Sequence, residues 1–138
     1  MEIKKGLVEI TEDESRMVVD ERFLLINFPV KKAVKINQYY DKIRNKEKQH
    51  IQSEIQNLAG FSEEAALLWS EKEAFEKLLT VTYSLLKKNP VLMVYTAGIS
   101  PESTSIYKNM MKDILEDQED KSLYLVRNAY TFTSFEYQ

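Results

Sequence analysis

The apolar run VLMVYT (91–96) constrains the fold of this chain more than any other segment. Pro90 precedes it and Gly98 follows it, and an uninterrupted apolar run between such boundaries predicts a buried strand. A strand that is buried on both faces needs other elements to cover it. The neighbouring segments therefore have to supply a sheet and the helices that pack on it.

The segments that follow this run alternate between helix and strand. Ser100 and Pro101 give the cap and first turn of a predicted helix. Its apolar face would carry residues at helical spacing: Ile106, Met110 and Ile114. Residues 122–135 predict a closing strand. This alternation indicates the α/β or α+β class, with a mixed sheet of about four to five strands and helices packed on it.

The N-terminal segment predicts a β-hairpin. Leu7 and Val8 open the first strand, and the polar stretch TEDES (11–15) would form the turn. The second strand would run through residues 17–28, which are rich in β-branched and aromatic residues. Pro29 would end this strand and start a helix, because a first helical turn does not need its missing N–H.

Beyond Pro29 the pattern becomes helical, and two later segments stay ambiguous. One apolar stripe on an otherwise lysine-rich helix is formed by Ala33, Ile36, Tyr40 and Ile43. The stripe fades in RNKEKQH (44–50), where we expect the helix to end. The segment HIQSEIQNL (50–58) fits both a helical face and a half-exposed strand, and periodicity cannot decide between them. Residues 80–90 are similarly either a strand or the last turns of a helix.

Length and composition indicate one globular domain over residues 1–138. Hydrophobic residues make up 43% and charged residues 30%. The formal net charge of −3 implies no attraction of the whole molecule to nucleic acid or anionic membrane. The chain has no cysteine, which excludes disulfides, thiolate zinc sites and cysteine nucleophiles. No apolar run has the length of a signal peptide or a membrane span, so we expect a soluble cytoplasmic protein.

The residues with catalytic or metal-binding chemistry form no recognisable motif. The one histidine, His50, lies in a polar stretch, and G-x-S-x-G does not occur. The acidic runs 11–15 and 116–120 lack the glycine and terminal glutamate of a calcium loop. The three glycines are isolated from one another, so no phosphate cradle is formed. We therefore expect a non-enzymatic protein without metal or cofactor.

Residues 31–48 are strongly basic and suggest one binding function. Seven cations face only Asp41 and Glu47 there: Lys31, Lys32, Lys35, Lys42, Arg44, Lys46 and Lys48. Tyr39 and Tyr40 lie among them and could stack on bases. One hypothesis is therefore a small accessory or antagonist protein that binds nucleic acid or a nucleic-acid enzyme. Its surface would be Lys31, Lys32, Lys35, Lys42 and Arg44.

The segment NLAGFSEEAALLWSEKEAF (57–75), together with the order of the predicted elements, resembles a STAS domain, the module of anti-sigma-factor antagonists. In that family a strand leads into a loop that ends in a serine or threonine at the start of the second helix. The resemblance implies a regulatory module that binds a protein partner. It implies that the partner contacts the corner formed by Phe61, Ser62, Glu63 and Glu64.

Two questions about contacts stay open at this level. Ser62 is either the cap of the following helix, with Glu63 and Glu64 in its first turn, or a phosphoacceptor. The last four residues, 135–138, include two aromatic side chains that could serve a homodimer or another partner.

Overall fold

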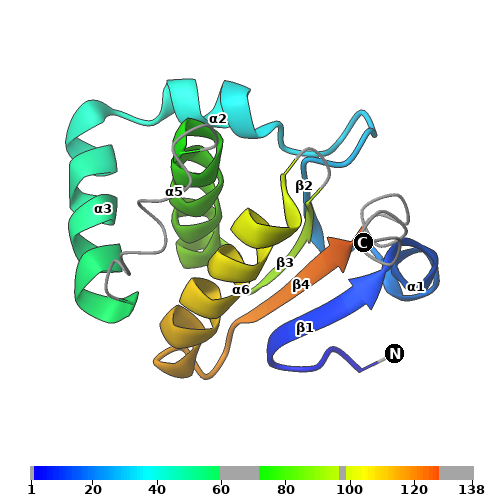
Figure 1. Cartoon of the computed structure of the whole chain (residues 1–138). Coiled ribbons are helices and arrows are strands. Elements are labelled where there is room, and N and C mark those ends of the chain that lie inside the picture. Colours follow the sequence, from blue (N-terminus) through cyan, green and yellow to red (C-terminus); the bar gives the residue numbers. More distant parts are fainter. Residues whose placement is uncertain (1, 60–71, 97–98, 128–138) are drawn as a thin grey trace.

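A four-stranded sheet organises the chain, and helices pack against it (Figure 1). The computed structural model describes residues 2–59, 72–96 and 99–127. The strands are β1 (Gly6–Thr11), β2 (Leu24–Ile26), β3 (Val91–Tyr95) and β4 (Ser122–Arg127). The helices are α1 (Glu12–Val18), α2 (Ile36–Lys42), α3 (Asn45–Ala59), α5 (Lys72–Lys88) and α6 (Pro101–Glu116).

Within the described residues, every strand pair of the sheet is parallel, and the order is β1-β4-β3-β2. The expected α/β class and the number of strands are confirmed, whereas the expected mixed sheet is wrong. Parallel neighbours cannot be joined by a tight turn, so each connection has to cross the sheet through a helix. This requirement accounts for the alternation of strands and helices along the chain.

The two faces of the sheet carry two separate apolar clusters. On β4, Leu123 and Leu125 point to the larger cluster, while Tyr124 and Val126 point to the smaller one. Helices α2, α3, α5 and α6 all contribute to the larger cluster (Figure 1). Burial on both faces explains why β3 and β4 are apolar at successive positions instead of alternating with polar residues.

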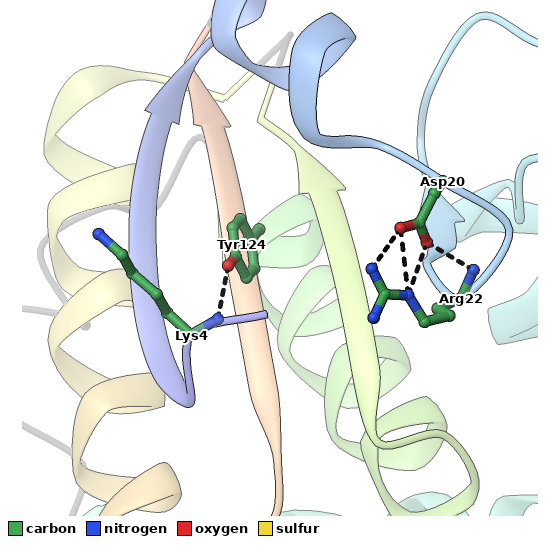
Figure 2. Close-up of polar contacts among 4 residues, drawn as sticks. All are labelled: Lys4, Asp20, Arg22 and Tyr124. Atoms are coloured by element: carbon green, nitrogen blue, oxygen red, sulfur yellow. Dashed lines mark hydrogen bonds and ion pairs between the residues drawn. The ribbon is translucent and has the colours of Figure 1, made fainter. Parts of the chain in front are cut away.

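The smaller cluster is held by contacts that span most of the sequence (Figure 2). The Tyr124 ring meets Phe23 edge to face at 5.1 Å, and its hydroxyl accepts the Lys4 backbone N–H at 2.9 Å. Asp20 and Arg22 form an exposed ion pair in the segment that leads to Phe23. The side-chain hydrogen bond from Arg22, together with its backbone N–H, lowers the pKa of Asp20 to about 2. These contacts fix the connection between α1 and β2.

The predicted N-terminal hairpin is wrong, because TEDES starts a helix instead of a turn. Thr11 is the N-cap of α1: its hydroxyl accepts the Glu14 N–H at 3.1 Å. The Glu14 carboxylate in turn accepts the Thr11 N–H at 3.2 Å, which completes a capping box. The predicted second strand, 17–28, shrinks to the three residues of β2, which lies at the opposite edge of the sheet from β1.

The region after β2 also differs from expectation. The helix expected directly after Pro29 begins only at Ile36, and Val34 first forms a parallel bridge with Ile26. The polar stretch 44–50 follows the end of α2 and carries the start of α3. The ambiguous residues 50–58 are helical, with Ile51 and Ile55 buried one turn apart.

In the carboxyl-terminal half, the structure agrees more closely with the elements predicted from the sequence. Residues 80–88 are the last turns of α5, and the buried strand predicted at 91–96 is β3. Ser100 caps α6 and Pro101 is its first residue, as predicted. The closing strand is confirmed over Ser122–Arg127, and residues 128–135 of that prediction lie outside the described residues.

The capping box gives a direct test of how α1 is held. We predict that Thr11→Ala lowers the free energy of unfolding by about 1 kcal/mol, because the Glu14 N–H loses its acceptor. Urea unfolding followed by circular dichroism measures this loss. Thr11→Ser keeps a hydroxyl at the same position and should retain most of the stability. Equal losses for alanine and serine would contradict the capping role.

A second prediction concerns a hydrogen bond in the larger cluster. The hydroxyl of fully buried Tyr107 donates to Thr82 Oγ1 at 2.8 Å, and Thr82 donates to the Leu78 carbonyl at 2.7 Å. Thr82→Val would strand the tyrosine hydroxyl and cost about 1–3 kcal/mol. Tyr107→Phe should cost about 1 kcal/mol, because Thr82 keeps its other bond. In urea unfolding, the double variant should lose less than the sum of the two, and strict additivity would contradict the coupling.

Candidate functional site

The corner predicted from the family resemblance lies outside the described residues. Phe61, Ser62, Glu63 and Glu64 fall between Ala59, where α3 ends, and Lys72, where α5 begins. The segment in front of the corner is helix α3, where the resemblance implies a strand. The described residues present three polar clusters, of which the first lies at the carboxyl edge of the sheet, and the basic surface.

The carboxyl ends of parallel strands meet at one edge of a sheet, where ligands of α/β proteins commonly bind. Here polar groups at the ends of the strands form hydrogen bonds with one another along that edge. The Tyr95 hydroxyl donates to Glu12 at 2.9 Å, and Asn27 donates to the Tyr95 carbonyl at 3.3 Å. Thr96 donates to the Val126 carbonyl at 3.1 Å. Burial, and then the bond to Glu12, raises the pKa of Tyr95. These polar groups hold β2, β3, β4 and α1 in place.

A second polar cluster joins β1, β4 and α6 around one carboxylate. Glu9 accepts from Lys108 Nζ at 3.0 Å and from Arg127 Nη2 at 2.9 and 3.0 Å. Partial burial acts to raise the pKa of Glu9, but the bonds and charges of Lys108 and Arg127 outweigh it, so the pKa is lowered. The sequence carries no signal for this cluster, because 118 positions separate Glu9 from Arg127.

A third cluster joins α3 to α5. Glu54 accepts from the Tyr83 hydroxyl, lies 3.0 Å from Lys87 Nζ and lies 2.5 Å from His50 Nε2. The Tyr83 bond, with the Lys87 and His50 contacts, lowers the pKa of Glu54, and burial followed by the same bond raises that of Tyr83. His50 thus lies on the surface, in an i,i+4 pair with Glu54.

The basic surface differs from these clusters because four of its cations are exposed and carry no ion pair within the described residues. We call these four the basic ridge: Lys31, Lys32, Lys42 and Arg44. Lys31 and Lys32 lie on the loop after β2, Lys42 ends α2, and Arg44 lies between α2 and α3. Figure 1 shows this loop, α2 and the start of α3 as one run across an end of the molecule.

Lys35, the fifth predicted member of the surface, is used inside the molecule. Its ammonium donates to the Phe28 carbonyl and lies 3.4 Å from the Val30 carbonyl oxygen. The side chain therefore spans the loop that carries Lys31 and Lys32. The sequence places Lys35 with the other lysines, and only the fold separates its role from theirs.

The two tyrosines of the basic segment are also engaged within the molecule. The Tyr40 ring lies under two ammonium groups, with Lys48 Nζ 4.0 Å and Lys77 Nζ 5.6 Å from its centroid. The Tyr39 hydroxyl lies 3.5 Å from the Ser84 hydroxyl, and its ring packs against the larger cluster. Stacking of bases on either ring would require these contacts to be given up.

The described residues offer neither a metal site nor a membrane span. They contain no group of three or more histidine, aspartate and glutamate side chains that could hold a metal ion. None of their helices has the length and apolar character needed to cross a membrane.

The Glu9 cluster gives a prediction for pH dependence. Because the folded-state pKa of Glu9 lies below its ordinary value of 4.5, the stabilisation is present above that value. It is lost as the pH falls through the lowered pKa. Wild type should therefore be more stable than Glu9→Gln at neutral pH, and the difference should shrink on acidification. Urea unfolding across pH tests this, with Glu2→Gln as the control. A difference that grows on acidification would contradict the assignment.

Comparison with known proteins supplies no assignment for these surfaces. No protein-family model matches the chain, and no significant match was found among curated proteins or among solved structures. The function therefore has to be inferred from the chain's own residues.

Proposed function

We propose that this chain is a non-enzymatic interaction module that binds an acidic surface of a protein partner through the basic ridge. The observation that carries the proposal is that four exposed cations without an ion pair in the described residues gather on the segment from the loop after β2 to the start of α3. Lys87, Lys108 and Arg127 are neutralised by glutamates of the same chain. The four ridge cations are exposed and carry no such partner in the described part of the chain.

The lowered pKa values of three carboxyl groups support an interaction role over a catalytic one. Glu9, Glu54 and Asp20 all have lowered pKa values. Cations of this chain hold Glu9 and Asp20, and the Tyr83 hydroxyl together with Lys87 holds Glu54. A carboxylate that is held ionised in this way is stabilised as a structural anion, whereas general acid catalysis at neutral pH needs a raised pKa. These groups therefore act in holding the elements together.

A protein partner is favoured over nucleic acid by the surroundings of the ridge. Proteins that bind single strands combine cations with aromatic rings on which bases stack. Here Tyr40 is covered by Lys48 and Lys77, and Tyr39 packs against the core. Asp41 and Glu47 interrupt the cations, which suits an acidic protein surface with some basic groups of its own.

The proposal is tested with a fluorescently labelled poly-glutamate peptide as the probe. Anisotropy should show binding to wild type that weakens as salt is added, because exposed charges are screened. The variant K31E/K42E/R44E should bind about tenfold more weakly or worse. The matched control K5E/K88E/K112E makes the same change in net charge at exposed lysines outside the ridge and should bind nearly as wild type.

The same assay separates the competing surfaces and partners. Equal loss in the ridge variant and in the control would mean that net charge alone drives binding, and the ridge would be rejected. Tighter binding of a single-stranded oligonucleotide than of the peptide, lost in the ridge variant, would replace the protein partner by nucleic acid. If F61A/E64K lost binding while K31E/K42E/R44E bound the peptide as wild type does, the contact would be assigned to residues 61–64 instead of the ridge.

A further inference from the structure

The loop that carries Lys31 and Lys32 is closed by hydrogen bonds at its base. The Asn27 N–H donates to the Val34 carbonyl at 2.8 Å, and the Val34 N–H donates to the Leu25 carbonyl at 2.9 Å. Asn27 adopts a φ of 64°, a left-handed conformation that asparagine tolerates better than most residues. Its side chain also donates to the Tyr95 carbonyl. The two ends of the loop are thus fixed to β2 and β3.

Further contacts connect residues within the loop itself. Ala33 is buried, and its N–H donates to the Val30 carbonyl at 3.2 Å. The Lys35 ammonium joins the Phe28 and Val30 carbonyls from inside the loop. The Phe28 ring packs on Tyr95 with centroids 5.2 Å apart. The loop therefore has a defined shape before any partner arrives.

The tip of this loop presents an apolar side chain between cations. Pro29, Val30, Lys31 and Lys32 are all exposed, and Val30 keeps 44% of its surface accessible. In the described part of the chain, the other large apolar side chains that are exposed are Met17 and Val19. An exposed valine costs little by itself, but a rigid loop that holds it beside two lysines offers an apolar and a cationic contact together.

We infer that the loop tip Pro29–Lys32, which carries Lys31 and Lys32 of the basic ridge, selects the partner, and that this tip docks a segment in which an apolar side chain is flanked by acidic residues. The inference rests on the proposed function and adds a requirement for the apolar side chain. Lys31 and Lys32 meet the flanking carboxylates while Val30 meets the apolar group. Because the loop is already ordered, binding does not have to pay for ordering it. Lys35 acts as a positioning residue that shapes the tip without touching the partner.

The experiment compares two labelled peptides, poly-glutamate and the same peptide with one central leucine. Wild type should bind the leucine peptide about fivefold more tightly, as expected for covering the remaining surface of one valine. Val30→Ser should bind the two peptides equally and leave the affinity for poly-glutamate unchanged. Met17→Ser removes a more exposed apolar side chain on α1 and should keep the preference.

The role of Lys35 is tested with two variants that remove one positive charge each. Lys32→Met should weaken binding of both peptides and keep the leucine preference. Lys35→Met should remove the preference and speed hydrogen exchange of the Asn27, Ala33 and Val34 amides, because the loop loses its internal contact. Unchanged exchange and an unchanged preference in Lys35→Met would overturn the positioning role.

The outcomes distinguish this inference from the proposed function. Binding of both peptides with equal affinity by wild type would overturn the inference and leave the basic ridge as an acidic-surface binder. A leucine preference that survives in Val30→Ser would also overturn it. Failure of wild type to bind either peptide would reject the proposed function and the inference together.

Discussion

The pairing of β4 with both β1 and β3 is the constraint on which the rest of the structure depends. Residues 122–126 of β4 are buried, and the side chains of residues 123–126 alternate between the two apolar clusters. Since both neighbours run parallel to β4, the chain has to return to the same end of the sheet before each strand. Of the helices that make these returns, α2, α3, α5 and α6 bury the larger cluster, whereas α1 packs Val18 against the smaller one. The strand pairing and the helical cover therefore require each other.

The position of the basic ridge follows from the same sheet order. β2 has three residues and, among the described strands, pairs with β3 alone, so the chain leaves the sheet at an edge. The bridge between Ile26 and Val34 ties the departing chain back, and the intervening residues form the closed loop. Helix α2 then packs against α5 and leads directly into α3. The segment from the loop after β2 to the start of α3, which carries Lys31, Lys32, Lys42 and Arg44, runs across one end of the molecule, where α2 packs on α5 (Figure 1).

Local sequence patterns were sufficient to predict an element when the residues of that element alone identify it. The apolar run 91–96 and the Ser100–Pro101 helix start were predicted correctly, since burial and capping leave marks within a few residues. The N-terminal hairpin failed although Thr11 and Glu14 have capping-box spacing, because a polar stretch between two apolar runs is also typical of a turn. The parallel partner of β1 lies more than a hundred residues away, and no local pattern identifies it. The basic residues were identified individually, but the separate role of Lys35 depends on where the Phe28 and Val30 carbonyls lie in the fold.

The net charge of −3 is a poor guide to the local electrostatic field that a partner near the ridge would experience. The exposed acidic side chains Glu116, Asp117, Glu119 and Asp120 lie at and just after the end of α6, which Figure 1 places at the opposite end of the molecule from α2. At physiological ionic strength, interactions between exposed charges fade over about 8 Å. The acidic end therefore cannot cancel the field of the ridge, and the two ends act as separate surfaces. An acidic surface of a partner would be attracted by the ridge despite the negative total charge, and the acidic turn would orient that partner by repelling it from the other end.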